Sequence, residues 1–357
     1  MRILVIGPDT DRSKGGMATA IQDIRYSRIL NDRFDVDIFA SYIDGSLPVR
    51  FLYSIYAYLR FLTIYKKYDL FHLHTASYGS TFRKYWYLKA IKKAGKKAIV
   101  HIHGAKYLAF YEQLSGRKKQ TVLRYLKGAE LVLALSKDWK DKFDAAFGLE
   151  NCRVLENGID TEMYAPAAAA GPETAHSFAV LGRFGQRKGT YDLVDAVEAA
   201  VKKVPDLICC LAGDGEVEKV KGIVRGKGLE RNIIVSGWLG QEEKVRLLKK
   251  VSTVVLPSYH EGLPMSVLEG MAAGKAVIST TVGAIPEVIG KENGILIEAG
   301  DINALTEALV RCCEDRKMVE DMAAENRKKI CGQFSLERMH GRLAEYYEEC
   351  EKQANVR

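Results

Sequence analysis

The sequence lacks the cysteine spacings that form zinc sites or disulfide frameworks. None of its seven cysteines stands in a C-x-x-C pair, and their number is odd. Small secreted domains stapled by disulfides typically carry an even number of cysteines at regular spacing. We therefore expect reduced thiols in a cytosolic compartment and no cysteine-based zinc site. The cysteines are Cys152, Cys209, Cys210, Cys312, Cys313, Cys331 and Cys350.

Long apolar runs are also absent. The most apolar stretch, residues 50–67, is interrupted by Arg50 and Arg60 and closed by Lys66 and Lys67. Because spanning a bilayer takes about 20 predominantly apolar residues, we expect no transmembrane helix here. Its apolar residues recur at helical spacing with tyrosines between them. This pattern fits a helix lying in a membrane interface, or a helix packed on a sheet with its lysines in water.

Three further patterns are missing. No G-x-G-x-x-G follows the first apolar segment, which disfavours a nicotinamide dinucleotide site. There is no internal repeat and no low-complexity tail. The first residues, "MRILVIGPDT", lack a basic region before a long apolar core, so we expect a β-strand there rather than a signal peptide.

The composition is that of a soluble globular protein of two domains. The chain has 357 residues, of which 47% are hydrophobic and 27% charged. Its net charge of +8 is concentrated in the N-terminal half, which suits nucleic acid, an anionic membrane surface or a phosphorylated substrate. The basic residues are spread over several elements without a recognition module, so we expect no nucleic-acid partner.

Short apolar segments alternate with longer amphipathic ones along both halves of the chain. This alternation predicts parallel β-α-β units, and hence an α/β fold. Residues 161–176, "TEMYAPAAAAGPETAH", break the pattern and are the best candidate for a linker. We expect a first domain at 1–165, a second domain at 166–335 and a final helix at 336–357. Open parallel sheets bind ligands at the carboxyl ends of their strands.

Two glycine-containing loops follow predicted strands. Gly15 and Gly16 lead into a helix, whose free N–H groups can bind an anion or a sugar; a plain loop is the alternative. Arg183 and Lys188 flank the loop "RFGQRK" before another helix. Two fixed cations there can neutralise a diphosphate, although surface cations are more often only solvated.

The segment "EGLPMSVLE" places Glu261 and Glu269 on either side of a helix start near Pro264. The N–H groups around Leu263 to Met265 attract a phosphate. Carboxylates repel one but accept hydrogen bonds from sugar hydroxyls. We therefore expect amides and cations to bind phosphate and the two glutamates to bind sugars.

"EGLPMSVLE", with its E-x7-E spacing, resembles the signature of the retaining family 4 (group 1) glycosyltransferases with the GT-B fold. The segments "LENGID", "LGRFGQRKG", "AGDGE", "VSGWL" and "NGILIEAGD" follow in the family's order, and "KGGM" and "HIHGA" fit in the first half. The resemblance spans essentially the whole chain. It implies two Rossmann-like domains facing across a cleft, an acceptor-binding domain at 1–165 and a nucleotide-sugar-binding domain at 166–335. The C-terminal helix would cross back to the first domain.

The resemblance also implies roles for single residues. The catalytic set would be Glu261, His103, Lys188 and Arg183. Arg183 and Lys188 would hold the diphosphate, Glu269 the ribose, and Glu261 and His103 would lie against the donor sugar. The other donor-binding residues would be Gly15, Gly16, Trp238, Leu239, Gly262, Leu263, Pro264 and Met265.

Three other residues receive weaker assignments. Asn157 would lie at the hinge edge of the cleft. We expect at most one of His72 and His74 to reach the cleft, and core histidines explain this pair at least as well.

No D-x-D-like pair lies near the diphosphate loop, because "DVD" at 35–37 falls in an early predicted strand. We therefore expect metal-independent catalysis without a cofactor. The family implies retention of configuration, by a front-face mechanism in which the departing phosphate helps to deprotonate the acceptor.

We expect a hexosyltransferase that uses a UDP-linked sugar and a glycan or polyprenyl-diphosphate-linked acceptor in bacterial capsule or exopolysaccharide synthesis. The enzyme would be cytoplasmic, with peripheral contact to the anionic inner membrane. Alternatives are a small soluble acceptor or a non-catalytic nucleotide-sugar-binding subunit. An epimerase or phosphorylase on the same fold is disfavoured by the E-x7-E helix.

Overall fold

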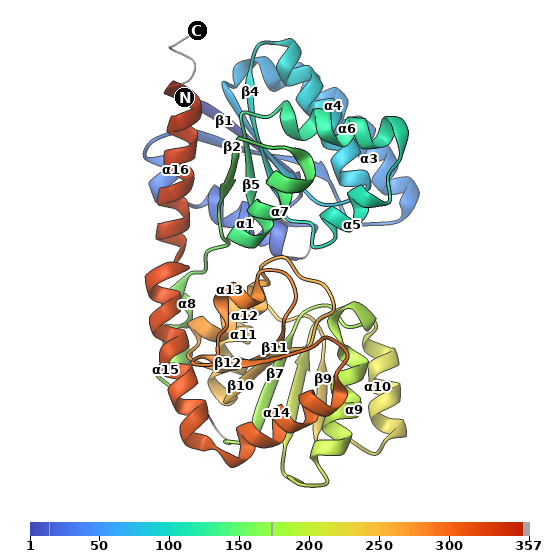
Figure 1. Cartoon of the computed structure of the whole chain (residues 1–357), viewed down its shortest axis with the longest axis vertical. Coiled ribbons are helices and arrows are strands. Elements are labelled where there is room, and N and C mark those ends of the chain that lie inside the picture. Colours follow the sequence, from blue (N-terminus) through green and yellow to red (C-terminus); the bar gives the residue numbers. More distant parts are fainter. Residues whose placement is uncertain (14, 173, 353–357) are drawn as a thin grey trace. The chain divides into compact units, whose positions relative to one another are not determined.

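The computed structural model describes residues 1–13, 15–172 and 174–352, which fold as two compact units. Unit 1 consists of Met1–Asn157 together with Leu336–Arg357, and unit 2 of Gly158–Ser335. Each unit contains one six-stranded sheet in which every strand pair is parallel, with helices on both faces (Figure 1). The predicted α/β fold of two Rossmann-like domains is confirmed.

The sheet of unit 1 has the strand order β2-β1-β3-β4-β5-β6. Its strands are β1 (Arg2–Pro8), β2 (Asp35–Tyr42), β3 (Leu70–Thr75), β4 (Lys97–Ile102), β5 (Leu131–Ala134) and β6 (Cys152–Val154). Its helices are α1 (Gly16–Arg25), α2 (Arg28–Asn31), α3 (Leu47–Ile64), η1 (Tyr65–Lys67), α4 (Gly79–Lys93), α5 (Tyr107–Glu112), α6 (Gly116–Lys127), α7 (Lys137–Phe147) and α16 (Leu336–Lys352).

Unit 1 has a hydrophobic cluster on each face of its sheet. Side chains alternate along a strand, so Ile3 and Val5 belong to one cluster while Leu4 and Ile6 belong to the other. Residues of α1, α2 and α16 complete the first cluster, and residues of α3, α4, α5, α6 and α7 complete the second. The sheet is thereby buried on both faces, as parallel sheets require.

The last helix, α16, is built into unit 1, although it follows unit 2 in the sequence (Figure 1). Leu343 and Tyr347 are buried against residues of β1, β3 and β4. Arg342 pairs with Glu156 at 2.6 Å, and the Tyr346 hydroxyl donates to the Val154 carbonyl at 2.8 Å. The C-terminal helix therefore crosses back to the first domain, as predicted.

Unit 2 has the strand order β12-β11-β10-β7-β8-β9. Its strands are β7 (Ser177–Leu181), β8 (Ile208–Ala212), β9 (Ile233–Ser236), β10 (Thr253–Leu256), β11 (Ala276–Thr280) and β12 (Gly294–Ile297). Its helices are α8 (Thr161–Ala168), η2 (Gln186–Lys188), α9 (Thr190–Ala200), α10 (Val217–Gly226), α11 (Gln241–Lys250), α12 (Met265–Ala272), α13 (Ile285–Val288), α14 (Ile302–Glu314) and α15 (Arg316–Gln333).

The segment expected to be a linker, residues 161–176, begins with the ordered helix α8. Asp160 caps this helix by accepting hydrogen bonds from the N–H groups of Glu162 and Met163. Tyr164 and Ala167 are fully buried, and the Arg327 guanidinium of α15 donates to the carbonyl of Thr161. The alanine-rich composition obscured a helix that tertiary packing stabilises. The two units meet in sequence at residues 157 and 158, whereas the prediction placed the boundary at 165.

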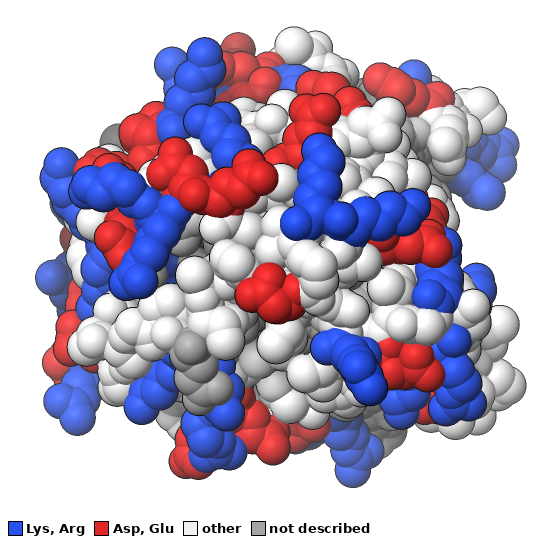
Figure 2. Space-filling model, turned by 90° about the horizontal axis from the view of Figure 1, so that it is seen from below, with Lys and Arg blue, Asp and Glu red and all other residues white. Residues whose placement is uncertain are grey.

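Among the residues that the structure describes, no helix is long and apolar enough to cross a membrane. The charges on the face drawn in Figure 2 are mixed, with lysine and arginine side chains interspersed with aspartate and glutamate.

Lys275, which precedes β11, generates a prediction about pH and stability. It is 2% exposed, and burial lowers the pKa of its ammonium from 10.5 to about 8. Between these values the unfolded chain binds more protons than the folded one, so the free energy of unfolding rises with pH across this window. Below pH 8 both states are protonated, and the folded state bears the full cost of the buried charge.

Lys275→Met should therefore raise the free energy of unfolding at pH 7 by about 1–3 kcal/mol. The gain should shrink as the pH rises from 8 to 10.5. Thermal and urea denaturation at pH 7 and pH 10 would measure it, with the exposed Lys291→Met as control. A loss of stability at pH 7 would contradict the analysis.

Candidate active site

The two glutamates of the E-x7-E segment are buried charges. Glu261 is 7% exposed in the loop after β10, and Glu269 is 6% exposed in the second turn of α12. Isolated carboxylates are costly to bury, so each requires a cation or several hydrogen-bond donors. The structure supplies a lysine to each of them.

Glu261 pairs with Lys188, whose ammonium lies 2.6 Å from its Oε1 atom. Lys188 ends the short helix η2 after β7, and β7 and β10 are neighbours in the sheet. Arg187 lies 3.7 Å from the same oxygen and donates to the His260 carbonyl at 3.1 Å. Two loops that are distant in sequence are therefore joined at the carboxyl ends of adjacent strands.

Glu269 forms an ion pair and hydrogen bond with Lys244 of α11. Sequence reasoning did not find Lys244, because it lies on a helix with many surface lysines and arginines. Only the three-dimensional structure identifies Lys244, because a buried glutamate requires a nearby cation. Each glutamate of the segment is thus neutralised by its own lysine.

Two glycines allow the site loops to pack this closely. A Cβ atom on Gly189 would lie 2.0 Å from the Pro257 carbonyl oxygen, and one on Gly283 would lie 2.2 Å from the Glu261 carbonyl oxygen. Both glycines have positive φ angles, 65° and 61°. Neither position accommodates a side chain without moving the loop that carries Glu261.

The start of α12 matches the predicted position closely. Pro264 is the N-cap and Met265 the first helical residue, so Pro264 stands one position before the helix proper. Leu263 is buried, and the Gly262 carbonyl accepts from the Ala284 N–H at 2.9 Å. The first N–H groups of an α-helix have no intrahelical acceptors, so this end can bind an anion.

Arg183, Trp238 and Leu239 lie after other strands of the same sheet. Arg183 follows β7, is exposed and makes no ion pair with any residue that the structure describes. Among the described residues, no hydrogen bond or ion pair joins it to Lys188 or Glu261. Trp238 and Leu239 follow β9; the indole is about half exposed, while Leu239 is partly buried.

The predicted residues of unit 1 lie at the carboxyl ends of its own strands. Gly15 is the N-cap and Gly16 the first residue of α1. His103 follows β4, and its Nε2 lies 2.9 Å from His74 Nδ1. Burial lowers the pKa of His103 to about 3, so its imidazole is neutral near pH 7. Asn157, the last residue before unit 2, is buried.

His72 and His74 are both fully buried on one face of the unit 1 sheet, with His101 of β4 beside them. One ring nitrogen from each lies within 4.8 Å of the others, which makes them the group among the described residues that could hold a metal ion. Burial lowers the pKa of His72 to about 3, and His72 Nδ1 lies 2.8 Å from the Tyr347 hydroxyl. These contacts fit neutral core histidines, one of the two interpretations that the sequence left open for His72 and His74.

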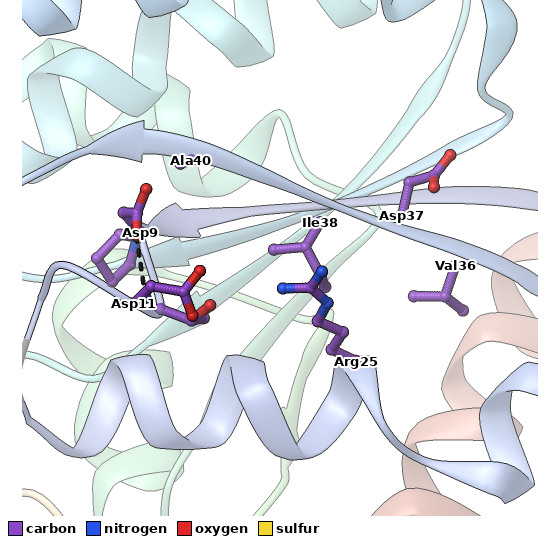
Figure 3. Close-up of a pocket in the computed structure, with 9 residues that line it drawn as sticks. Asp9, Asp11, Arg25, Val36, Asp37, Ile38 and Ala40 are labelled. Atoms are coloured by element: carbon purple, nitrogen blue, oxygen red, sulfur yellow. Dashed lines mark hydrogen bonds between the residues drawn. The ribbon is translucent and has the colours of Figure 1, made fainter.

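A small polar cavity of about 250 Å³ opens beside β1 and β2 (Figure 3). Asp9, Asp11, Asp37 and Arg25 line it. Asp9 Oδ1 accepts a hydrogen bond from the Asp11 N–H at 2.9 Å and thereby fixes the loop after β1. The Asp9 carboxylate therefore has a structural role in this loop.

Comparison with known proteins places both units in one family. A family described as "Glycosyltransferase Family 4" matches residues 21–163, and one described as "Glycosyl transferases group 1" matches residues 166–329. A UDP-Gal:alpha-D-GlcNAc-diphosphoundecaprenol alpha-1,3-galactosyltransferase of Escherichia coli is 23% identical over 361 residues, covering 89% of each chain.

Two further proteins are similar. A GDP-mannose:cellobiosyl-diphosphopolyprenol alpha-mannosyltransferase of Xanthomonas campestris is 25% identical over 251 residues, covering 68% of this chain and 63% of its own. The crystal structure of Anabaena Alr3699/HepE in complex with UDP-glucose has the same fold. It has a TM-score of 0.75 at 22% identity and covers 98% of this chain and 100% of that one.

The two family matches follow each other along the chain and together cover most of it. The second match contains Glu261, Glu269 and Lys188. The protein therefore belongs to the family 4 (group 1) glycosyltransferases of GT-B fold, enzymes that act on nucleotide sugars.

Proposed function

We propose that this enzyme is a retaining, metal-independent hexosyltransferase that moves a sugar from a UDP-sugar to a polyprenyl-diphosphate-linked acceptor in bacterial polysaccharide synthesis. The observation that carries the proposal is the pair of buried glutamates in unit 2, each neutralised by a lysine beside the start of α12. The Escherichia coli and Xanthomonas relatives are named for diphosphate-linked polyprenol acceptors, which supports the acceptor class.

In this proposal the donor diphosphate binds to cations and helix N–H groups of unit 2. Lys188 carries three N–H donors, so it can keep its bond to Glu261 while another N–H reaches a phosphate oxygen. Arg183, exposed after β7, supplies the second cation. The first N–H groups of α12 add the positive end of its dipole.

The two glutamates bind the hydroxyl groups of the donor. Glu269, fixed by Lys244, accepts hydrogen bonds from the ribose, and Glu261 accepts them from the transferred sugar. The chain around Trp238 and Leu239 meets the uracil. We assign UDP as donor nucleotide because the Escherichia coli relative is named for UDP-Gal and the Anabaena protein was crystallised with UDP-glucose.

The chemical step breaks the bond between the anomeric carbon and the phosphate oxygen, which leaves with the electron pair. The acceptor hydroxyl attacks from the same face and gives its proton to the departing phosphate. Lys188 and the α12 N–H groups stabilise the developing negative charge. Glu261 is not the nucleophile in this scheme, because its carboxylate is already engaged by Lys188 and lies near Arg187.

Retention and metal independence have separate support. Nucleotide hexoses such as UDP-galactose are α-linked, so the α-linked products in the relatives' names correspond to retention. The loop beside the proposed diphosphate site has no D-x-D pair, and the two nearest buried carboxylates are occupied by lysines. Protein cations take the place of a metal. The role assigned to His103, in unit 1, stays a prediction.

The outer face of α3 supports peripheral membrane binding. Ala57 and Phe61 pack into the core of unit 1, so the helix is anchored on one side. Its other side exposes large apolar side chains, a pattern typical of helices that lie in a membrane interface. These are Leu47, Val49, Phe51, Leu52, Ile55, Tyr56, Leu59 and Leu62. Exposed Arg60, Lys66 and Lys67 adjoin them and complement an anionic lipid surface.

Donor binding and hydrolysis would be measured first, against UDP-glucose, UDP-galactose, UDP-N-acetylglucosamine and GDP-mannose with and without EDTA. We expect EDTA-resistant turnover of one UDP-sugar. Lys188→Ala should lower it by about a hundredfold to a thousandfold, because the leaving phosphate loses a preorganised donor. Lys221→Ala, which removes an exposed lysine paired with Glu218, is the control. Binding without turnover or transfer would favour the non-catalytic subunit.

Gly283→Ala should weaken donor binding tenfold or more. The new Cβ would displace the Glu261 carbonyl, and an alanine at φ 61° carries a backbone cost of about 1–2 kcal/mol. Gly222→Ala on α10 is the matched control, because no atom lies within 4 Å of its Cβ position. The control should keep full affinity. Equal donor affinity in both variants would show that the close approach at Gly283 does not contribute to donor binding.

Membrane binding would be measured by co-sedimentation with vesicles containing phosphatidylglycerol. Replacing Arg60, Lys66 and Lys67 together by glutamate should abolish binding, since charge attraction becomes repulsion. The same charge change at Lys202, Lys203 and Lys291, all exposed in unit 2, should leave it intact. Retained binding in the first triple variant would refute the membrane role of α3.

A further inference from the structure

Unit 1 contains a cavity of about 480 Å³ at the carboxyl ends of its first strands. The loop at the start of α1, the beginning of α3, the loop after β3 and the first turns of α4 enclose it. This volume lies within the range of about 300–1,000 Å³ that is typical of small-molecule sites. Its polar lining includes Gly16, Arg50, Ser77, Ser80, Arg83 and Lys84.

Three cations line this cavity without a carboxylate partner among the residues that the structure describes. Lys84 is 2% exposed, and its ammonium donates to the Ser41 hydroxyl at 2.6 Å. The guanidinium groups of Arg83 and Arg50 lie 4.9 and 5.9 Å from the centre of the Tyr42 ring. Asp44, which interacts with Tyr42, is the one acidic residue in the lining. The cavity lining therefore has more basic than acidic side chains.

A buried cation without an anion is costly, and this cost indicates a missing negative partner. Burial, followed by the charge of Arg83, lowers the pKa of Lys84 well below its ordinary value. An anion bound beside the ammonium would oppose this shift and restore the charged form. The cavity is thus arranged for a ligand that brings negative charge with it.

Unpaired polar atoms in the lining point to the same kind of ligand. Among the described residues, the buried Ser13 hydroxyl has no hydrogen-bond partner, and neither have the Ser77 hydroxyl and the Nε atom of Arg83. Ser13 is 8% exposed and lines the cavity. The starts of α1 and α4, helices of ten and fifteen residues, add N–H groups. These donors suit an oxyanion with several acceptor oxygens.

We propose that this cavity binds the diphosphate of a lipid-linked acceptor, held by Arg50, Arg83 and Lys84. The inference rests on the proposed function for its acceptor class, and it assigns residues to that acceptor. Arg50 belongs to α3, whose outer face is apolar. One helix therefore supplies a surface for the lipid chain and a cation for the phosphate group. A prenyl diphosphate combines these two chemistries in one molecule.

The proposal is tested by isothermal titration of the full chain with farnesyl diphosphate, inorganic pyrophosphate and UDP. We expect farnesyl diphosphate to bind at least tenfold more tightly than pyrophosphate, because only the former has an apolar chain. Arg83→Gln and Lys84→Met should each weaken farnesyl diphosphate binding at least tenfold and leave UDP affinity within twofold. Lys93→Gln, an exposed lysine on the same helix, should change neither.

Several outcomes would overturn the proposal. The proposed site would be refuted if the wild type did not bind farnesyl diphosphate, or if the variants bound it as tightly as the wild type. If the variants lost as much affinity for UDP as for farnesyl diphosphate, the cavity would belong to the donor site. If the wild type bound pyrophosphate as tightly as farnesyl diphosphate, the lipid chain would play no part in binding. Arg83 is partly exposed, so Arg83→Gln remains informative if thermal denaturation shows that Lys84→Met is misfolded.

Together with the UDP-sugar binding and hydrolysis measurements, these titrations separate this inference from the proposed donor function. Failure to bind any UDP-sugar, together with Arg83-dependent binding of farnesyl diphosphate, would refute the donor assignment and support the cavity. Binding and turnover of a UDP-sugar without any farnesyl diphosphate binding would do the opposite.

Discussion

The buried ion pair between Glu261 and Lys188 is the interaction on which the proposed donor site depends. It joins the loop after β10 to the loop after β7, and these are neighbouring strands of one sheet. Gly189 and Gly283 permit the close approach of these loops. A second buried ion pair, between Glu269 of α12 and Lys244 of α11, repeats the arrangement. Removing either partner of such a pair leaves an uncompensated buried charge, which costs more than an exposed ion pair contributes.

The two units differ in whether their buried charged side chains have partners of opposite charge. Unit 2 neutralises its buried carboxylates with lysines, so the ligand-free site is balanced before substrate arrives. In unit 1, Arg50, Arg83 and Lys84 face a cavity without carboxylate partners among the described residues. A balanced site suits a ligand whose hydroxyls and phosphates need separate partners. An unbalanced one suits a ligand that is anionic throughout its polar part.

The periodic and local features of the fold could be predicted from the sequence. Strand–helix alternation gave the α/β class, and the E-x7-E segment gave the start of α12 within one residue. Composition misled at residues 161–168, where an alanine-rich segment with Pro166 forms α8 because Asp160 caps it and Tyr164 is buried. The sequence pattern of α3 left two interpretations open. In the structure Phe61 packs inward while Phe51 stays exposed, and membrane binding by the exposed side stays a prediction.

The contacts that define the sites were out of reach of sequence reasoning. Lys244 and Glu269 lie on separate helices, and no local pattern connects them. Arg50 of α3 and Arg83 of α4 converge on Tyr42 of β2. In the sequence Lys244, Arg50 and Arg83 are each one basic side chain among many. The burial and proximity that distinguish them arise only when the strands of the two sheets are in their final order.

The position of α16 has a consequence for the order in which the protein is made. Unit 2 is a continuous segment, whereas unit 1 needs residues from both ends of the chain. During synthesis the second unit can fold as soon as residue 335 leaves the ribosome. Until α16 emerges, the face of the unit 1 sheet that carries Ile3, Val5 and Ile99 lacks the cover of Leu343 and Tyr347. The first unit to be translated is therefore the last to be completed, and one face of its sheet stays partly uncovered until the end of synthesis.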